Sequence, residues 1–426
     1  MAELDTLREE NLRLRRAVEE LSILNDLGRA IGASLNSQDI MQTIIRRSLK
    51  AANAEQGVIT LVDRREEQTM GVTLVRTMMS SSDHTQFHLN QNLVGWMQLN
   101  KKPLISDDVR NDDRFRGVQW DEEIRSLLCV PLMVKSELTG VLAVFNKKGA
   151  KTFSDDDQRL LAILASQSAQ IVENARLYEA EREFVKMQEE VRLAAKIQSD
   201  LLPRTSPSLS GYEIAGKNIP AQVVGGDYFD FITLDEHRVA ICLADVSGKG
   251  LPASLLMSNT QATIRSQSLV NATPSECLTR ANILLYRTTS PEKFVTLFYG
   301  ILDTKTHDFT YSNAGHDSPY FMTSSQFSRL EKGGTVLGVI EPFDYEQDSV
   351  TLAFADTIVI YSDGITESFN EKDEPFGEER IESVLKQHHQ APASAIVDEI
   401  INAAKEFAGR RQQADDMTVV VIKRTT

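Results

Sequence analysis

The apolar positions of the chain change their period several times, and the first period is a heptad. Seven residues near the N-terminus occupy the a and d positions of this repeat: Leu4, Leu7, Asn11, Leu14, Val18, Leu21 and Asn25. The pattern predicts a coiled coil over residues 1–25. An amide at an a position selects two parallel strands, so Asn11 favours a parallel homodimer. The alternative is a single amphipathic helix packed on its own domain.

Residues 22–175 mix helical and strand-like patterns. The apolar spacing is helical over residues 23–35 and 40–51. Short apolar runs predict four strands, at residues 57–62, 71–75, 127–132 and 140–145. A polar loop region precedes the last two strands, and a long helix follows them. This order of elements resembles a GAF domain, a small antiparallel sheet flanked by helices that often senses a ligand. Leu-Ile-Ser-Asp-Asp-Val at 104–109 and Cys-Val-Pro-Leu at 129–132 strengthen the resemblance.

One set of residues in this region resembles a ligand-binding pattern. Asn146, Lys147, Phe153 and Asp157 match cyclic-nucleotide-binding GAF domains, but Gln158 stands where that pattern has glutamate. Ser-Asp-Asp-Asp at 154–157 is also a capping box with acids at a helix N-terminus, and we favour this simpler interpretation. Other candidates for the lining of a pocket are His84, His88 and Trp96, for which packing or surface positions are the commoner roles. The GAF ligand is therefore unknown.

A second apolar stripe joins this region to the rest of the chain. Its positions alternate by three and four residues: Leu177, Ala180, Phe184, Met187, Val191, Ala194, Gln198 and Leu201. Because the segment contains neither Gly nor Pro, it predicts a coiled-coil linker helix over residues 176–203. Pro203 and the Ser/Pro-rich residues 204–210 end the helix and begin a last domain, 204–426.

In the last domain, aspartates follow or flank apolar runs at four places. They are Asp227, Asp245, Asp363 and the doublet Asp415-Asp416. The runs at 239–244, 357–361 and 418–422 predict buried strands that would hold these acids rigidly. Carboxylates that converge from separate strand ends suit Mg²⁺ or Mn²⁺, which prefer oxygen ligands, and such sites suit phosphate chemistry.

The order of these motifs resembles the metal-dependent Ser/Thr protein phosphatases, the PPM family, and specifically its bacterial SpoIIE/RsbU branch. The resemblance covers about residues 205–425 and includes Asn-Ala-Gly-His at 313–316, between the second and third aspartates. Residues 194–203 also resemble the stretch that precedes such catalytic domains. The resemblance implies an αββα sandwich that holds two Mn²⁺ or Mg²⁺ ions. These ions would share a water, lower its pKa and direct it at a phosphoserine or phosphothreonine.

The same resemblance implies the roles of the site residues. The catalytic metal carboxylates would be Asp227, Asp245, Asp363 and Asp415, and the Val246 carbonyl would be a further metal ligand. Asp416 stands where the wider family often has Asn, so either acid of the doublet could face the metal, and we favour Asp415.

Three further residues have open roles. The wider family commonly has Gly-His after its second aspartate, whereas this chain has Val-Ser-Gly-Lys-Gly at 246–250, so the group that protonates the leaving oxygen is unassigned. Lys249 could meet the substrate phosphate or be only solvated. His316 could be a general acid, but a role in fixing a loop is favoured. Asp230 could orient a metal-bound water or be a solvated loop carboxylate.

Length, charge and cysteine content indicate the number of domains, the kind of partner and the cellular compartment. The chain has 426 residues, which predicts two or three domains, and its formal net charge of −15 argues against a nucleic-acid-binding surface. Its three cysteines, Cys129, Cys242 and Cys277, are widely spaced and resemble reduced core residues. No secretory signal or membrane span is recognisable, so we expect a cytoplasmic protein that does not bind membranes.

Together these patterns predict an α+β multidomain protein in which coiled-coil helices join a GAF domain, residues 22–175, to a PPM-type sandwich. We expect a homodimeric Ser/Thr phosphatase regulated by its GAF domain. Its substrate by family analogy is a phosphorylated STAS-type anti-anti-sigma factor. The alternative is a catalytically silent scaffold of the same fold that binds a phosphoprotein, which the presence of all four aspartates disfavours. A two-metal cyclase is disfavoured by the motif order, and a histidine kinase by the lack of its nucleotide loop.

Overall fold

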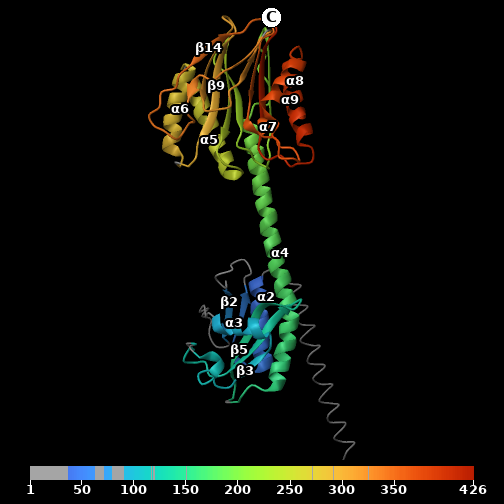
Figure 1. Cartoon of the computed structure of the whole chain (residues 1–426). Coiled ribbons are helices and arrows are strands. Elements are labelled where there is room, and N and C mark those ends of the chain that lie inside the picture. The colour runs from blue at the N-terminus through green and yellow to red at the C-terminus, as the bar shows by residue number, and fades with distance from the viewer. Residues whose placement is uncertain are drawn as a thin grey trace, which may run out of the picture. The chain divides into compact units, whose positions relative to one another are not determined.

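The computed structural model in Figure 1 describes residues 37–62, 72–78 and 91–426, except residues 117, 119, 150, 271, 291 and 325. The predicted coiled coil at 1–25, the predicted helix at 23–35, His84 and His88 lie outside the described residues. The chain divides into two compact units, Met1–Lys186 and Met187–Thr426.

The first unit contains one five-stranded antiparallel sheet with the order β2-β1-β5-β4-β3. Its strands are β1 (Ala54–Val62), β2 (Val72–Met78), β3 (Leu104–Ser106), β4 (Leu127–Val134) and β5 (Glu137–Lys147). Its other elements are α2 (Ser37–Ala52), α3 (Gln91–Asn100), the 3₁₀ turn η1 (Asp113–Phe115) and the first part of α4 (Asp155–Leu201). The strands predicted at 57–62, 127–132 and 140–145 therefore lie within β1, β4 and β5, and the one predicted at 71–75 overlaps β2.

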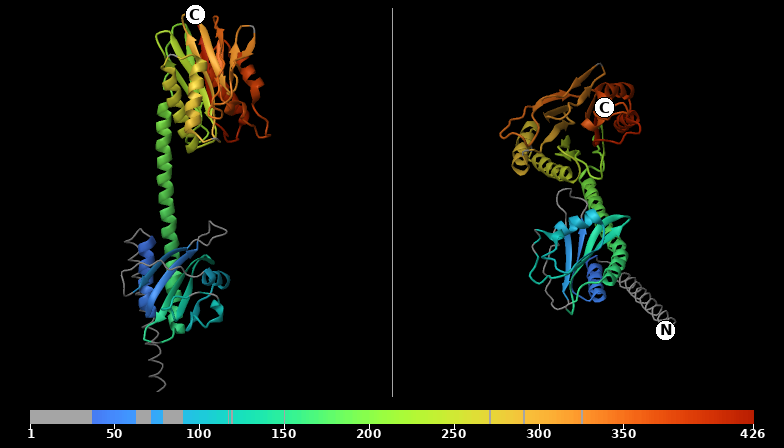
Figure 2. Two further views of the ribbon diagram at one scale, coloured as in Figure 1. Left: turned by 90° about the vertical axis from the view of Figure 1, so that its left-hand side faces the viewer. Right: turned by 60° about the horizontal axis from the view of Figure 1, so that its bottom comes forward.

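Side-chain alternation along β1 divides the core of this unit into two. Ile59 faces α2 and α4, where it packs with Leu49 and Leu161. Val58 faces the opposite side of the sheet, where Leu93 and Met97 of α3 cover it. Successive side chains of a strand point to opposite faces, so both faces of this sheet are buried (Figure 2).

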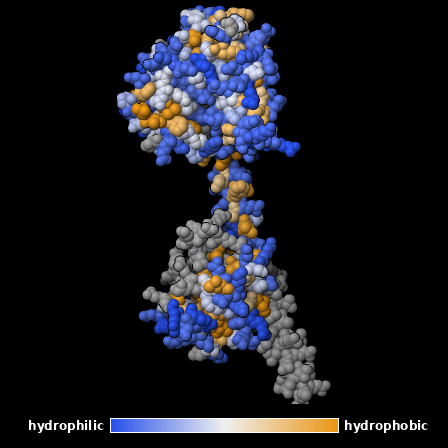
Figure 3. All heavy atoms as spheres, viewed as in Figure 1, coloured by the Kyte–Doolittle hydropathy of each residue, from blue (hydrophilic) through white to orange (hydrophobic). Residues whose placement is uncertain are grey.

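Helix α4 is one uninterrupted helix of 47 residues, so the long helix that follows the predicted GAF strands continues into the predicted linker helix. Three acids, Asp155, Asp156 and Asp157, occupy its first turn, where they interact favourably with the helix dipole. It ends at Leu201, two residues before Pro203, as predicted. Large apolar side chains are exposed along its middle and last turns, as Figure 3 shows in part: Leu177, Tyr178, Phe184, Val185, Met187, Leu193 and Ile197.

The second unit contains two sheets. The first sheet has the order β13-β10-β9-β8-β7, with β14 also paired to β10, and the second has the order β12-β11-β15-β16-β6. The strands are β6 (Tyr212–Ile219), β7 (Tyr228–Thr233), β8 (Arg238–Val246), β9 (Val295–Asp303), β10 (Asp308–Ala314), β11 (Tyr320–Met322), β12 (Phe327–Arg329), β13 (Gly333–Gly334), β14 (Asp348–Thr351), β15 (Thr357–Tyr361) and β16 (Met417–Arg424). The helices are α5 (Leu251–Ser268), α6 (Pro274–Thr288), α7 (Asp363–Thr366), α8 (Gly377–His388) and α9 (Ala393–Ala408).

Three apolar clusters hold these elements in four layers. Between the sheets, Leu243 and Phe298 of the first sheet pack with Ile360 of the second. On the outer face of the first sheet, α5 and α6 bury apolar side chains such as Met257. On the outer face of the second sheet, α8 and α9 bury side chains such as Ile396. The order helix, sheet, sheet, helix is the predicted αββα sandwich, and the α+β fold class is confirmed (Figure 1).

The three cysteines are buried and free of disulfides, as predicted. Cys129 lies in the first unit, and Cys242 and Cys277 lie in the core between the first sheet and α5–α6. Within the described part of the chain, we find no helix with the length and apolar character needed to cross a bilayer.

Candidate metal centre

The two strand pairs at the centre of the sandwich bring the predicted acids to their ends. In the first sheet, β7 pairs antiparallel with β8 and aligns Tyr228 with Ala244, so Asp227 and Asp245 lie at the same edge. In the second sheet, β15 pairs antiparallel with β16 and aligns Tyr361 with Val419. Asp363, which begins α7, and Asp415 therefore also share one edge. Each sheet supplies two carboxylates.

Electrostatic effects show that the two pairs of acids lie close together. Burial, and then the charges of Asp363 and Asp415, raise the pKa of Asp245 to about 7. Burial, and then the charge of Asp415, raise the pKa of Asp363 to about 6. The pKa of Asp227 lies well above its usual value, first because of burial and then because of Asp245. Buried carboxylates that repel one another in this way are typical of functional sites.

The chemistry of this cluster fits divalent ions. Among the described residues, no group of three or more His, Cys, Asp or Glu side chains is arranged so that it could hold a metal ion. The loop that carries Asp227 nevertheless approaches the Val246 carbonyl and the Asp245 carboxylate closely, because Gly226 has no side chain. A Cβ at Gly226 would lie 3.2 Å from the Val246 carbonyl oxygen and 3.5 Å from Asp245 Oδ1. A carbonyl oxygen and a carboxylate beside this loop, close to further acids that repel one another, suit a hard cation that would relieve the repulsion.

The two acids of the doublet have different surroundings. Both carboxylate oxygens of Asp416 accept backbone N–H groups, from Ala221 at 2.7 Å and from Gly226 at 2.6 Å. Asp416 also accepts the N–H of Asp227 at 3.2 Å. The Asp415 side chain is 36% exposed, and its Oδ2 lies 2.8 Å from Lys249 Nζ. Asp416 thus organises the loop that carries Asp227, and the assignment of Asp415 as the metal ligand, which remains a prediction, is favoured.

The Asp363 turn is attached directly to this doublet. Ser362 Oγ donates to the carbonyl of Asp416 at 3.0 Å and accepts the N–H of Thr418 at 2.9 Å. Thr418 Oγ1 donates in turn to the Asp227 carboxylate. Ser362 and Thr418 were not among the residues predicted for the site, although each is a hydroxyl residue within two positions of a predicted aspartate motif.

Asp230 has neither of the roles considered for it. Its side chain is completely buried and accepts Arg265 Nε at 2.6 Å and Nη2 at 2.9 Å. The hydroxyl of Tyr228 donates to it at 2.7 Å. Because Asp230 lies within β7 and faces α5, it anchors that helix to the sheet. The strand alternation that points Asp227 and Asp230 to opposite sides could have predicted this.

His316 fixes a loop. Its Nδ1 lies 2.9 Å from Thr296 Oγ1, and its backbone N–H donates to Asn313 Oδ1 at 2.7 Å. Burial lowers the pKa of His316 to about 4, so the imidazole is neutral at pH 7. A neutral, buried ring is not a proton donor for a leaving group, which supports the favoured interpretation.

In the first unit, the residues that resemble a cyclic-nucleotide pattern serve the fold. Lys147 Nζ bonds Asp157 at 2.6 Å, and Asp157 accepts both the N–H and the hydroxyl of Ser154 at 2.9 Å. This is the capping interaction that initiates α4. The amide of Asn146 bonds the backbone of residues 123–126. Trp96 packs against the core that α3 covers.

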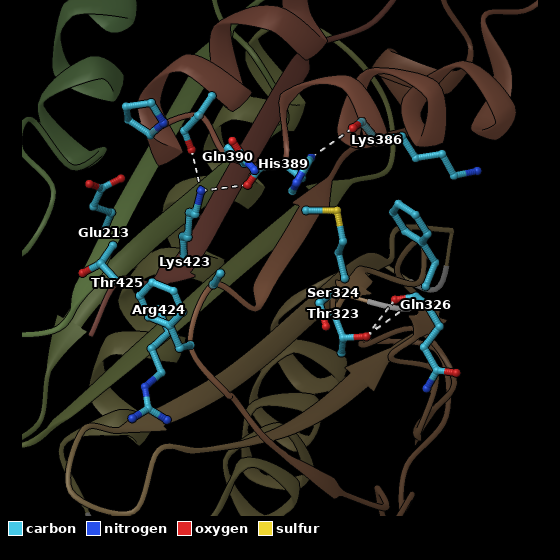
Figure 4. Close-up of a pocket in the computed structure, with 16 residues that line it drawn as sticks. Glu213, Thr323, Ser324, Gln326, Lys386, His389, Gln390, Lys423, Arg424 and Thr425 are labelled. Atoms are coloured by element: carbon cyan, nitrogen blue, oxygen red, sulfur yellow. Dashed lines mark hydrogen bonds between the residues drawn. The ribbon is translucent and has the colours of Figure 1, made fainter.

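A separate pocket of about 800 Å³ lies at the opposite ends of β15 and β16 from the aspartates (Figure 4). Its most buried cation, Lys423, donates to the carbonyls of His389 at 2.8 Å and Ala391 at 2.7 Å. Carbonyls that follow the end of α8 are natural partners for an ammonium group. The position of Lys423 in the pocket is therefore explained by these two hydrogen bonds. The pocket lies far from the four aspartates.

The raised carboxyl pKa values predict a pH effect on the metal-free protein. An aspartate in the unfolded chain titrates near 4, whereas folded Asp245 titrates at about 7. Over this range the folded state holds a proton that the unfolded state has released, so the free energy of unfolding falls as pH rises. Saturating Mn²⁺ should abolish this loss, because it favours the ionised carboxylate.

Thermal unfolding in EDTA between pH 4 and pH 8 checks this prediction. His316 titrates in the opposite sense, since its lowered pKa makes stability rise with pH. The carboxyl contribution is therefore the difference between wild type and Asp245→Asn. We expect the melting temperature of wild type to fall relative to that of Asp245→Asn as the pH rises from about 4 to about 7. A difference in melting temperature that does not change with pH would contradict the assignment.

An αββα sandwich with four aspartates gathered at its strand ends defines a protein of the PP2C phosphatase class. The family model for stage II sporulation protein E (SpoIIE) matches residues 235–425, and a GAF domain model matches residues 34–173. Phosphoserine phosphatase RsbU of Bacillus subtilis is 32% identical over 238 residues, which are 55% of this chain and 70% of that protein. Protein IcfG of Synechocystis is 24% identical over 263 residues, covering 55% of this chain and 41% of that protein.

A solved structure supports the same fold. The PP2C domain of SiaA from Pseudomonas aeruginosa superimposes with a TM-score of 0.51 at 22% identity and covers 57% of this chain and 99% of that domain. The chain belongs to the SpoIIE/RsbU family of PP2C-type phosphatases, with a GAF domain before its phosphatase domain. This family is metal-dependent, in agreement with the donor set described above.

Proposed function

We propose that the protein is a metal-dependent protein serine/threonine phosphatase whose activity its GAF domain regulates. The observation that carries the proposal is the convergence of Asp227, Asp245, Asp363 and Asp415 from two sheets, with carboxyl pKa values raised by burial and mutual repulsion. These carboxylates, with the Val246 carbonyl, would hold two Mn²⁺ or Mg²⁺ ions. Bound ions of this kind activate water and neutralise phosphoryl oxygens.

Side chains around this site hold its carboxylates in position. Asp416 holds the N–H groups of the loop before β7, and Thr418 orients the Asp227 carboxylate. Lys249, which pairs with Asp415, is half exposed at the edge of the site and can contact a substrate phosphate. The mechanism requires no covalent nucleophile, and no side chain is assigned as the general acid.

The proposed substrate is a phosphorylated STAS-domain anti-anti-sigma factor. Support comes from the similarity to RsbU, whose name describes a phosphoserine phosphatase. The acidic chain, with a net charge of −15, gives no support for a nucleic-acid partner. We also propose that the protein acts in the cytoplasm, where phosphoproteins of this kind occur.

Two assays test the activity. The purified chain should release phosphate from a phosphoserine peptide with Mn²⁺ and not with EDTA. It should dephosphorylate a phospho-STAS protein faster than the peptide at equal concentration. Binding of the phosphoprotein without release of phosphate would support the alternative, a silent scaffold, whereas equal rates on both substrates would remove the STAS proposal.

We further propose that the chain is a homodimer. The support is the exposed apolar stripe on α4, since Leu177 and Phe184 lie one heptad apart and are 56% and 58% exposed in the single chain. Side chains of this kind pack against a partner helix in a coiled coil. The heptad at residues 1–25 adds Asn11, which favours two parallel chains.

Light scattering should therefore give the mass of a dimer for the full chain at micromolar concentration. Replacing both Leu177 and Phe184 with glutamate should shift the mass toward the monomer, because charge in the seam opposes packing. Arg182→Glu, on the same helix but outside the stripe, should stay dimeric. A monomeric wild type would rule out the proposal.

Asn11→Ile should raise thermal stability, because a buried amide at an a position costs stability, and it should make the number of chains in the coiled coil less specific.

A further inference from the structure

The last turn of α4 touches the metal centre through one buried side chain. Gln198 is 9% exposed, whereas its neighbour Ile197 is 57% exposed. The amide of Gln198 makes two hydrogen bonds to one residue: Nε2 donates to the Gly225 carbonyl at 2.7 Å, and Oε1 accepts the Gly225 N–H at 3.0 Å. The side chain thus pairs with the backbone of Gly225 as a neighbouring strand would.

Gly225 lies in the loop that carries Asp227, and this loop has little other support. Among the described residues, no backbone-to-backbone hydrogen bond holds residues 220–227. Its backbone N–H groups are bound instead by two side chains, Asp416 and Gln198. The position of Asp227 relative to the other acids therefore depends on a residue of the phosphatase core and on a residue of the linker helix.

The contact is also tightly packed on the metal side. A Cβ at Gly225 would lie 2.3 Å from Asp416 Oδ2, so the loop backbone rests directly on this carboxylate. A displacement of Gly225 would disturb the hydrogen bonds from Gly226 and Asp227 to Asp416, which are one and two residues further along. A single amide thereby connects α4 to the loop that carries Asp227 and to Asp416, which holds that loop.

We propose that Gln198 is a positioning residue that couples α4 to the metal centre. When the last turn of α4 rotates or shifts, the amide carries Gly225 with it and changes the placement of Asp227. Because α4 is continuous from Asp155 to Leu201, a movement that begins at its N-terminal end reaches Gln198 without a break in the helix. This inference rests on the proposed function, since it concerns the regulation of the same site.

The first test compares Gln198→Ala with Gln188→Ala in the full chain. Gln188 is an exposed glutamine on the same helix and is the matched control. Mn²⁺ affinity is measured from the electron paramagnetic resonance signal of free Mn²⁺, which does not depend on enzyme activity. We expect Gln198→Ala to weaken Mn²⁺ binding at least tenfold and to regain most of its activity at saturating Mn²⁺, as a positioning role requires.

A second substitution separates the two hydrogen bonds. Gln198→Glu keeps an acceptor for the Gly225 N–H but places a carboxylate against the Gly225 carbonyl, so it should not restore Mn²⁺ affinity. Melting temperatures of all variants are measured in EDTA to confirm folding. Mn²⁺ affinities within twofold for Gln198→Ala and Gln188→Ala would overturn the proposal.

The coupling itself is tested by changing the register of α4. One residue inserted after Phe184 rotates the two parts of the helix by about 100° relative to each other, whereas seven residues nearly restore the register. We expect the single insertion to change basal activity severalfold in the wild type and not to change it further in Gln198→Ala. An equal change in both backgrounds, or none in the wild type, would show that Gln198 does not transmit the movement.

These readouts distinguish the role of Gln198 from the proposed phosphatase activity. If the wild type hydrolyses no phosphoprotein but Gln198→Ala still weakens Mn²⁺ binding, the proposed function fails and the contact with the metal site stands. If hydrolysis is confirmed and Gln198→Ala binds Mn²⁺ normally, the function stands and the role of Gln198 is wrong.

Discussion

Replacement of Asp245 or Asp363 by asparagine is expected to abolish Mn²⁺-dependent phosphatase activity while the protein stays folded. Both carboxylates are partly buried beside other acids, where their negative charges are unfavourable without a cation. Loss of one such charge contact in a catalytic centre costs about 10²-fold or more in rate. Steady-state hydrolysis of a phosphoserine peptide measures the effect, and a residual rate above roughly a tenth of wild type would remove the assignment.

The same substitutions should have the opposite effect on the stability of the metal-free protein. Asparagine is nearly isosteric with aspartate and removes a charge that burial and neighbouring acids oppose, so the melting temperature in EDTA at pH 8 should rise. Asp398→Asn is the control, because Asp398 pairs with Lys217 on the surface at 2.7 Å. A variant that loses activity and also melts earlier than wild type in EDTA would indicate a structural role instead.

The second large effect is expected for Gly364→Ala. A Cβ at Gly364 would lie 2.1 Å from the carbonyl oxygen of Asp416 and 3.2 Å from the carbonyl carbon of Asp415. These are backbone atoms, so the turn must move away from the start of β16 and separate Asp363 from Asp415. Overpacking of this kind costs about 1–3 kcal/mol. We expect activity at limiting Mn²⁺ to fall by about 10²-fold.

Gly95→Ala is the matched control for this substitution. A Cβ at Gly95 meets no atom within 4 Å, and its position within α3 favours alanine over glycine. Its activity and Mn²⁺ affinity should equal those of wild type. If Gly364→Ala binds Mn²⁺ as tightly as Gly95→Ala does, the tight packing between α7 and the aspartate doublet is not needed for the site.

Much of the fold could be predicted because its strongest signals are local. The apolar runs at 239–244, 357–361 and 418–422 are buried strands in the structure, and the proline after α4 ends that helix as expected. The continuity of α4 was less evident, since its first part packs in the core of the first unit whereas the apolar stripe of the linker is exposed. When the apolar face of one continuous helix packs on a domain in one part and is exposed in another, the sequence pattern changes as it would at a domain boundary.

The site was predicted less completely, and for a physical reason. Motif order gave the aspartates, but the partners of a side chain depend on strand alternation and long-range pairing. Asp230 is only three residues from Asp227 and yet binds Arg265 in another layer. Gln198 stood in the predicted apolar stripe of the linker, although its amide bonds Gly225. A polar residue within an apolar stripe was the signal that could have revealed this contact.

The origin of the four acids in two different sheets has a kinetic consequence. An ion bound between the ends of β7–β8 and β15–β16 bridges layers that join only when the sandwich closes. The unfolded chain does not hold the four carboxylates together, and each sheet supplies only two of them, so ions bind tightly only after the slow pairing of distant segments is complete. Interactions that form after the transition state slow unfolding and leave the refolding rate almost unchanged. Mn²⁺ is therefore expected to lengthen the lifetime of the folded domain rather than to speed its formation.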